Sequence, residues 1–176
     1  MLGFWCAIPM QGDGCLPPMG MKLLIIHPDD LFRNHLVERM RLENLRVLET
    51  SIEAEASDIV QRENLDVVLL GATGSQQNRF AFLKMIRKVR PFSEVILLTA
   101  AEDHSFEGAI KAMQLGAFDD LLLPIDIHVL MSRIREAFKK KKARVRAMKE
   151  VIGKGRKGRT IERLSESGTR LHHDKP

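Results

Sequence analysis

Short apolar runs alternate along this chain with segments of helical periodicity, and that alternation leaves few folds open. The runs occupy residues 22–26, 45–50, 66–70, 94–99 and 120–123. The middle run, Val67-Val68-Leu69-Leu70, is apolar on both faces, which is typical of a parallel strand covered by helices on both sides. Five such strands separated by helices predict a (βα)5 open parallel α/β sheet of three layers with right-handed crossovers.

Helix start and stop signals lie between these runs. Asp29 or Asp30 can cap a first helix, Asp126 can cap the last one, and Gly116 is a good C-terminal signal for the fourth. A second helix is predicted over 52–62, and a polar loop over 71–78 precedes the third. Apolar residues, most of them three or four positions apart, mark the other helices: Leu31, Leu36 and Met40; Phe80, Leu83, Ile86 and Val89; Phe106, Ile110, Met113 and Leu115; Leu130, Ile134 and Phe138.

The chain divides into three parts by composition. Residues 1–20 are rich in Gly, Pro and Met and predict a disordered leader, with Met21 as an alternative initiator. Residues 21–138 form the predicted domain, and 139–176 form a basic extension and tail. Between residues 139 and 163 there are twelve Lys or Arg and two Asp or Glu, so the rest of the chain is mildly acidic.

Several protein classes are disfavoured. Cys6 and Cys15 lie outside the predicted core and complete no metal-ligand spacing, so we expect neither a disulfide framework nor a metal site. No apolar run reaches the roughly 20 residues that span a bilayer. Residues 1–20 lack the basic and apolar regions of a signal peptide. These observations favour a cytoplasmic protein.

The second half of the domain carries the most specific motifs. They are Val95-Ile-Leu-Leu-Thr-Ala100, then Leu115-Gly-Ala117, then Leu121-Leu-Leu-Pro124. In these motifs, and over residues 22–138 as a whole, the chain resembles the receiver domain of bacterial two-component response regulators, the CheY-like family. The resemblance implies a flavodoxin-like fold and a role in phosphorelay signal transduction.

The same resemblance implies where a phosphoryl site should lie. A working receiver has two acidic residues after its first strand and an acceptor aspartate after its third, which together hold Mg²⁺. It also has a Thr or Ser after the fourth strand and a Lys after the fifth. Here His27 and Pro28 align with the acidic pair, Gly71 with the acceptor and Leu123 with the lysine.

Little of that site is retained. Thr99 survives, Asp29 is a stray carboxylate beside the metal position, and Asp120 stands at the aromatic switch position. No acyl phosphate can form at a glycine. We therefore expect a pseudo-receiver without aspartyl phosphorylation, without a cofactor, and with weak or absent Mg²⁺ binding.

Each candidate residue also has a plainer interpretation. His27 could bind a metal or titrate near neutral pH, or simply be hydrogen-bonded in a loop. The 71–78 loop could cradle a phosphate, although it lacks the ending of a P-loop and is more simply a connection. Thr99 could be a remnant. Asp119 and Asp120 lie on the usual partner face of receivers, or in a solvated turn.

The last helix is predicted to continue beyond the domain. Val145, Met148 and Ile152 extend its apolar spacing as far as Gly153, with Lys141 breaking the stripe once. Residues 153–159 are then predicted to be flexible and cationic. Basic residues that could bind a polyanion by counterion release are Lys139, Lys140, Lys141, Lys142, Arg144, Arg146, Lys154, Arg156, Lys157 and Arg159.

Three functions remain open. The first is a receiver-like module, not an enzyme, that binds a signalling protein or a second copy of itself as a homodimer. The second is a nucleic-acid-associated protein that uses the basic tail. The third and weakest is a flavodoxin-like cofactor binder at the strand ends.

Overall fold

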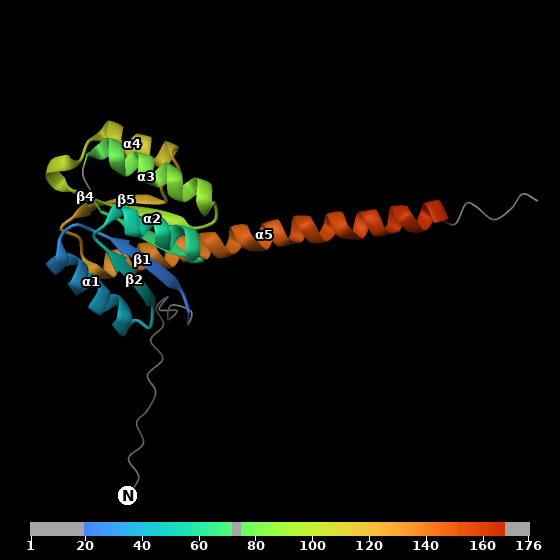
Figure 1. Ribbon diagram of the computed structural model, residues 1–176, viewed down its shortest axis with the longest axis horizontal. Coiled ribbons are helices and arrows are strands. Elements are labelled where there is room, and N and C mark those ends of the chain that lie inside the picture. The colour runs from blue at the N-terminus through green and yellow to red at the C-terminus, as the bar shows by residue number, and fades with distance from the viewer. Residues whose placement is uncertain (1–19, 72–74, 168–176) are drawn as a thin grey trace, which may run out of the picture.

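The computed structural model describes residues 20–71 and 75–167, with side chains as far as Ile152. Its centre is a five-stranded parallel sheet in the order β2-β1-β3-β4-β5 (Figure 1). The strands are β1 (Lys22–Ile26), β2 (Arg46–Thr50), β3 (Val67–Leu70), β4 (Glu94–Ala100) and β5 (Asp119–Leu123). All four pairings are parallel, as the alternation of the sequence predicted.

Helices cover both faces of the sheet. They are α1 (Asp30–Leu42), α2 (Glu53–Arg62), α3 (Gln76–Val89), α4 (Phe106–Gln114) and α5 (Ile127–Ser167), with a short 3-10 turn η1 (Ala101–Asp103). Alternate residues of β1 point to opposite sides: Leu23 packs with α1 and α5, and Leu24 with α2, α3 and α4. The three-layer α/β/α fold is confirmed.

The predicted capping residues occupy their expected places. Asp29 accepts a hydrogen bond from the Phe32 amide at 2.9 Å and begins α1. Asp126 accepts from the His128 amide at 2.7 Å and begins α5. Gly116 ends α4 with φ +94°, a conformation that favours glycine.

The loop after β3 is shorter than predicted. Ser75 caps α3 by accepting from the Asn78 amide at 3.3 Å, so the helix begins at Gln76 rather than after Asn78. The polar residues of the first turn concealed this start, because they show no apolar period. Their inclusion in a loop was therefore wrong.

The apolar residues that marked α4 face solvent. Phe106 is 77% exposed, and Ile110 and Met113 are each 42% exposed. The buried positions of this helix are the small residues Gly108 and Ala112. A Cβ at Gly108 would meet the ends of the Gln76 and Ser105 side chains, so this part of α4 lies next to the start of α3.

The last helix is longer than predicted. It continues through Gly153 to Ser167 and projects from the domain (Figure 1). A glycine costs a helix about 1 kcal/mol but keeps its backbone hydrogen bonds, and the residues between the glycines are mostly good helix formers. The predicted end at Gly153 and the flexible segment over 153–159 were therefore wrong. No helix among the described residues is long and apolar enough to cross a membrane.

Candidate functional site

The carboxyl ends of β1, β3, β4 and β5 meet at one edge of the sheet, where ligands bind in open α/β folds. His27 follows β1, Gly71 follows β3, Thr99 lies near the end of β4, and Leu123 ends β5. The sequence therefore placed its candidate residues at the correct edge. The contacts of these residues show which chemistry this edge can support.

His27 occupies the space that a side chain at residue 71 would need. A Cβ built on Gly71 would lie 2.3 Å from His27 Cδ2 and 3.0 Å from the Ile26 carbonyl oxygen. The Gly71 amide donates to that carbonyl at 2.8 Å, which holds the backbone in place. An imidazole at position 27 and a carboxylate at position 71 are therefore incompatible without a shift of one of them.

The imidazole of His27 is itself held by its surroundings. Its Nδ1 accepts a hydrogen bond from the Asp29 amide at 3.1 Å, and its ring lies 4.5 Å from the Phe32 ring, centroid to centroid. Only 9% of the residue is exposed. Burial lowers the pKa of His27 below its ordinary value, since desolvation disfavours the imidazolium.

The carboxylates next to this histidine already serve the fold. Asp29 caps α1, and the hydrogen bond from the Phe32 amide lowers the pKa of its carboxyl group. Asp30 accepts from Arg33 Nη2 at 2.7 Å, while Arg33 Nη1 donates to the His27 carbonyl at 2.8 Å. Both carboxylates that follow His27 are therefore engaged, Asp29 by the first turn of α1 and Asp30 by Arg33.

A buried guanidinium, which the sequence analysis missed, contacts Thr99. Arg79, on the first turn of α3, is 4% exposed and donates through Nη1 to Thr99 Oγ1 at 3.0 Å. Thr99 Oγ1 in turn donates to Asp120 Oδ1 at 2.5 Å. Arg79, Thr99 and Asp120 form a relay of hydrogen bonds that links α3, β4 and β5. Arg79 Nε is buried and has no partner among the described residues.

A signal for Arg79 existed in the sequence. It lies three and four positions before Phe82 and Leu83, on the buried face of α3. That position marks the face of α3 on which Arg79 lies, but its burial depends on a partner 20 residues further along the chain, Thr99.

No cation replaces the receiver lysine at the end of β5. Leu123 packs against the hydrophobic cluster that α1 and α5 form with the sheet. Across the described residues, no group of three or more His, Cys, Asp or Glu side chains is placed to hold a metal ion. The described residues at this edge provide hydrogen-bond donors and the buried positive charge of Arg79. They do not provide three carboxylates that could together bind a divalent cation.

The two aspartates of the predicted partner face differ in their contacts. Asp119 pairs with Arg133 Nε of α5 at 3.1 Å, and its Oδ1 accepts from the Asp120 amide. Asp120 accepts from Thr99. Both are partly buried, so neither is a free carboxylate in a solvated turn.

The basic residues predicted to form a polyanion-binding tail divide into two sets. Lys141 is buried and donates to Asp66 Oδ1 and to the Leu65 carbonyl, each at 2.7 Å. Arg144 donates to the buried Glu94 at 2.8 Å, and Lys140 lies 3.8 Å from the same carboxylate. These three residues fasten α5 to the sheet, and Lys141 in particular is not available to a polyanion.

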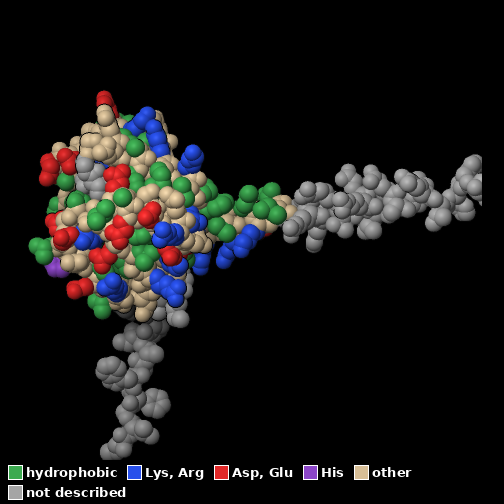
Figure 2. All heavy atoms as spheres, in the orientation of Figure 1, with side chains coloured by type: hydrophobic (Ala, Val, Ile, Leu, Met, Phe, Trp, Pro, Cys, Tyr) green, Lys and Arg blue, Asp and Glu red, His purple; other side chains and the backbone are tan. Residues whose placement is uncertain are grey.

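The second set is exposed. Lys139, Lys142 and Arg146 are on the surface of α5, with the Lys142 ammonium 4.6 Å from the centre of the Phe138 ring. Figure 2 shows basic and hydrophobic side chains together where the described part of α5 leaves the body. Side chains of Lys154, Arg156, Lys157 and Arg159 lie outside the described part of the chain.

Comparison with known proteins identifies the domain. Residues 23–135 match the response regulator receiver domain. The chain belongs to this family. GlrR of Escherichia coli K12, a transcriptional regulatory protein, is 30% identical over 115 residues, which are 65% of this chain and 26% of GlrR. The chain thus spans about a quarter of that relative.

Solved receivers share its fold. A receiver domain from Clostridium thermocellum is 26% identical with a TM-score of 0.63, over 70% of this chain and 98% of that one. A response regulator of Burkholderia pseudomallei, solved with a phosphorylated aspartic acid and a calcium ion, is 15% identical with a TM-score of 0.60, over 70% and 72%. The CheY-like fold predicted from the sequence is confirmed.

Proposed function

We propose that this chain is a receiver-like signalling module of a two-component system that takes no phosphoryl group and acts by binding a protein partner in the cytoplasm. It is not an enzyme in this proposal, and it needs no cofactor. The observation that carries the proposal is the pairing of His27 with Gly71, since the imidazole fills the place of an acceptor side chain.

The charges at this edge support the same conclusion. A phosphorylation site needs a divalent cation held by carboxylates, and His27, Arg33 and Arg79 bring the opposite charge or none. Arg79 donates a hydrogen bond to Thr99 Oγ1 from inside the domain. The hydroxyl that contacts a phosphoryl group in receivers is therefore already engaged.

The partner surface in this proposal is the face of α4, β5 and α5. Its elements carry exposed apolar residues: Phe106, Ile110 and Met113 of α4, Leu122 of β5 at 44% and Val129 of α5 at 49%. Exposed apolar residues gathered on adjacent elements are typical of interaction sites. Asp119 and Asp120 lie on the same elements, and the partner is a signalling protein or a second copy.

Incubation with acetyl phosphate and Mg²⁺, read by intact mass, tests the phosphorylation part of the proposal. We expect no mass increment of a phosphoryl group under conditions that label a control receiver fully. A base-labile phosphoryl adduct on residues 21–138 would overturn the proposal.

Substitution on α4 tests the partner surface. Phe106→Ser with Ile110→Ser should abolish binding of a protein that wild type captures, and also any self-association seen by sedimentation. Leu31→Ser with Leu42→Ser is the matched control, since both residues are exposed apolar positions of α1. Equal loss of binding in both variants would contradict the surface assignment.

Nucleic-acid binding is a second candidate, favoured by the exposed cations Lys139, Lys142, Arg146 and Lys149 of α5. Counterion release predicts that affinity for a DNA duplex falls steeply with salt concentration. The cofactor-binder alternative has less support, because it rests on the fold alone.

A further inference from the structure

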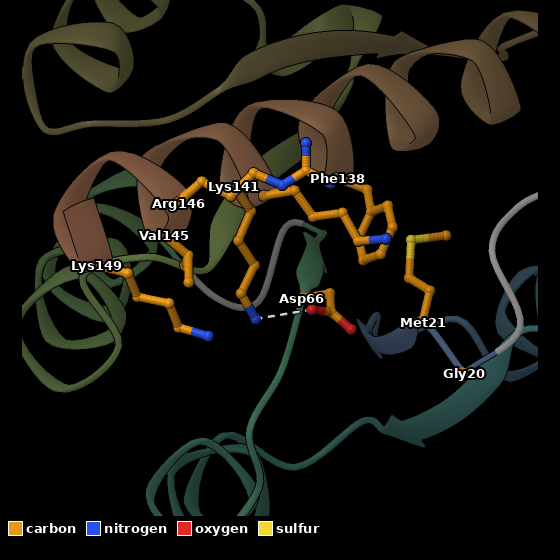
Figure 3. A pocket seen from close by; sticks show the side chains of 9 residues that line it. Gly20, Met21, Asp66, Phe138, Lys141, Val145, Arg146 and Lys149 are labelled. Carbon is orange, nitrogen blue, oxygen red and sulfur yellow. Dashed lines mark hydrogen bonds and ion pairs between the residues drawn. The ribbon is translucent and has the colours of Figure 1, made fainter. Parts of the chain in front are cut away.

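A groove lies at the opposite end of the sheet from the receiver site. It has a volume of about 430 Å³ and lies between α5 and the amino ends of β1 and β3 (Figure 3). Its apolar lining comes from Met21, Phe138 and Val145. Its charged lining comes from one carboxylate, Asp66, and from four cations, Lys141, Lys142, Arg146 and Lys149.

The single carboxylate of the groove is already neutralised. Asp66 Oδ1 accepts from Lys141 Nζ at 2.7 Å, and Oδ2 accepts from the Lys22 amide at 2.8 Å. Figure 3 shows the Lys141 side chain reaching down to this carboxylate. Lys142, Arg146 and Lys149 remain exposed, so the groove presents a surplus of positive charge beside an apolar lining.

The apolar lining continues along α5 beyond the body. Phe138, Lys141, Val145, Met148 and Ile152 follow one another at alternating spacings of three and four residues, the a and d pattern of a coiled coil. Met148 and Ile152 are about half exposed and pack against no described part of the chain. The helix therefore carries an open seam that begins in the groove.

The charges beside this seam decide what can cover it. Lys142 and Lys149 occupy its e positions, and Arg144 occupies a g position. In a parallel pair of identical helices, Arg144 would face Lys149 of the second copy. In an antiparallel pair, Lys142 would face Lys149. Like charges at these positions oppose pairing, so a second copy fits the seam poorly.

We propose that the groove and the seam of α5 bind an acidic amphipathic helix of a partner protein. Apolar residues of that helix would cover Val145, Met148 and Ile152, and its carboxylates would face Lys142, Arg146 and Lys149. This surface is separate from the α4, β5 and α5 face and from the receiver site, so the inference does not rest on the proposed function.

The test uses the full chain and a fluorescein-labelled peptide of four heptads, with Leu at the a and d positions and Glu at e and g. A peptide of the same composition in scrambled order is the reference. We expect the ordered peptide to bind at least tenfold more tightly by fluorescence anisotropy. Equal affinity for both peptides, or no binding at millimolar peptide, overturns the inference.

Variants of the protein separate the contributions. Lys142→Glu with Arg146→Glu and Lys149→Glu should weaken ordered-peptide binding more than tenfold. The matched control, Lys84→Glu with Lys88→Glu and Lys111→Glu, changes the net charge equally on exposed positions of α3 and α4 and should have less than a threefold effect. Equal loss in both triple variants overturns the inference in favour of general charge attraction.

Substitutions in the apolar seam distinguish an acidic helix from a DNA duplex or a second copy of the chain as its ligand. Met148→Ser with Ile152→Ser should weaken peptide binding at least tenfold and leave binding of a DNA duplex unchanged. Two results overturn the inference: tighter binding of the duplex than of the ordered peptide, and sedimentation as a dimer that this variant converts to monomer.

Discussion

The side chains of residues 27 and 71 compete for one volume at the carboxyl edge of the sheet. Gly71→Ala places a Cβ 2.3 Å from His27 Cδ2, so the ring must move. Overpacking of this kind costs about 1–3 kcal/mol. In a His27→Ala background the same substitution should cost less than half as much, because the ring is gone. A cycle of four urea denaturation curves measures the difference, and equal costs in both backgrounds would refute the steric account.

Burial of His27 also predicts how stability depends on pH. The folded protein holds the pKa of His27 below the ordinary 6.5, so between these two values the unfolded state binds more protons. Unfolding free energy should therefore fall as pH falls through about 6.5, with a slope of at most about 1.4 kcal/mol per pH unit for one proton.

The comparison variant for this titration is His27→Asn, whose Oδ1 can accept the Asp29 amide as Nδ1 does. Asp29 should not add to this slope in either protein. The pKa of its carboxyl group is lowered from an already acidic value, so its effect on the unfolding free energy falls below the pH range of the measurement. Thermal denaturation between pH 5 and 8 should thus show the slope in wild type alone. An identical slope in His27→Asn would assign it to another group.

The hydrogen-bond relay at Thr99 predicts that substitutions of Thr99 and of Arg79 lower the unfolding free energy by different amounts. Thr99→Val removes the acceptor of Arg79 and the donor to Asp120 at once, which leaves two polar groups unsatisfied. We expect a loss of about 1–3 kcal/mol. Arg79→Met should cost less, because Thr99 Oγ1 keeps its bond to Asp120 and only the donor to it is lost.

The double variant Arg79→Met with Thr99→Val supplies the check. Its unfolding free energy should exceed the value expected from the sum of the single losses, because one of the unsatisfied groups no longer exists. Additive losses, measured by urea denaturation, would mean that the hydrogen bond between Arg79 and Thr99 contributes nothing to stability.

At the level of helices, α5 is positioned by ion pairs at the amino ends of two neighbouring strands. Lys141 reaches Asp66 before β3, and Arg144 reaches Glu94 at the start of β4. The Glu94 side chain is fully buried and Arg87 of α3 also lies 3.7 Å from it. Two anchors one turn apart set the direction in which the helix leaves the body.

Removal of one anchor should be costly. Lys141→Met keeps the stem of the side chain and removes the cation that pairs with Asp66 Oδ1, while Asp66 Oδ2 and the Leu65 carbonyl keep their bonds from the Lys22 amide and from Ser93 Oγ. We expect a loss of about 2–4 kcal/mol, toward the value for breaking a buried ion pair. Lys139→Met is the control and should lie within about 0.5 kcal/mol of wild type, because Lys139 is exposed. A small effect of Lys141→Met on the denaturation midpoint would contradict this anchoring.

Local patterns in the sequence predicted the strands and most helix ends, because apolar period, Asp caps and a C-terminal glycine act within a few residues. They also placed His27, Gly71, Thr99 and Leu123 at one edge. Patterns could not predict that Arg79 and Lys141 are buried, since a charge in an apolar stripe is stable only through tertiary partners far along the chain. Long-range contacts were the missing information.

The whole molecule has two surfaces of opposite character at the two ends of its sheet. At the carboxyl edge, the side chains of His27, Arg79 and Thr99 are buried in the domain. The amino edge is open and positively charged around the groove beside α5. In the function proposed above, regulation through this domain would come from what binds its surfaces, because a ligand can bias only a state with which it has a different interaction energy.

Magnesium should consequently leave the stability of the wild-type protein unchanged. A variant with His27→Asp, Pro28→Asp and Gly71→Asp brings three carboxylates together and removes the ring that excludes a side chain at position 71. Their mutual repulsion should lower its unfolding free energy without metal. Added Mg²⁺ should then restore stability by mass action, by about 2.7 kcal/mol at a hundred times the dissociation constant.

A variant with Asn at positions 27, 28 and 71 has nearly the same shape as the Asp variant but lacks its negative charges. It therefore shows whether a response to Mg²⁺ comes from the charges or from the altered packing. It carries no added carboxylate, so its thermal midpoint should not respond to Mg²⁺, as in wild type. The decisive measurement is the shift of that midpoint across a Mg²⁺ titration in the three proteins. A shift in wild type as large as in the carboxylate variant would show that the edge already holds a divalent ion, which the present contacts of His27 and Arg33 oppose.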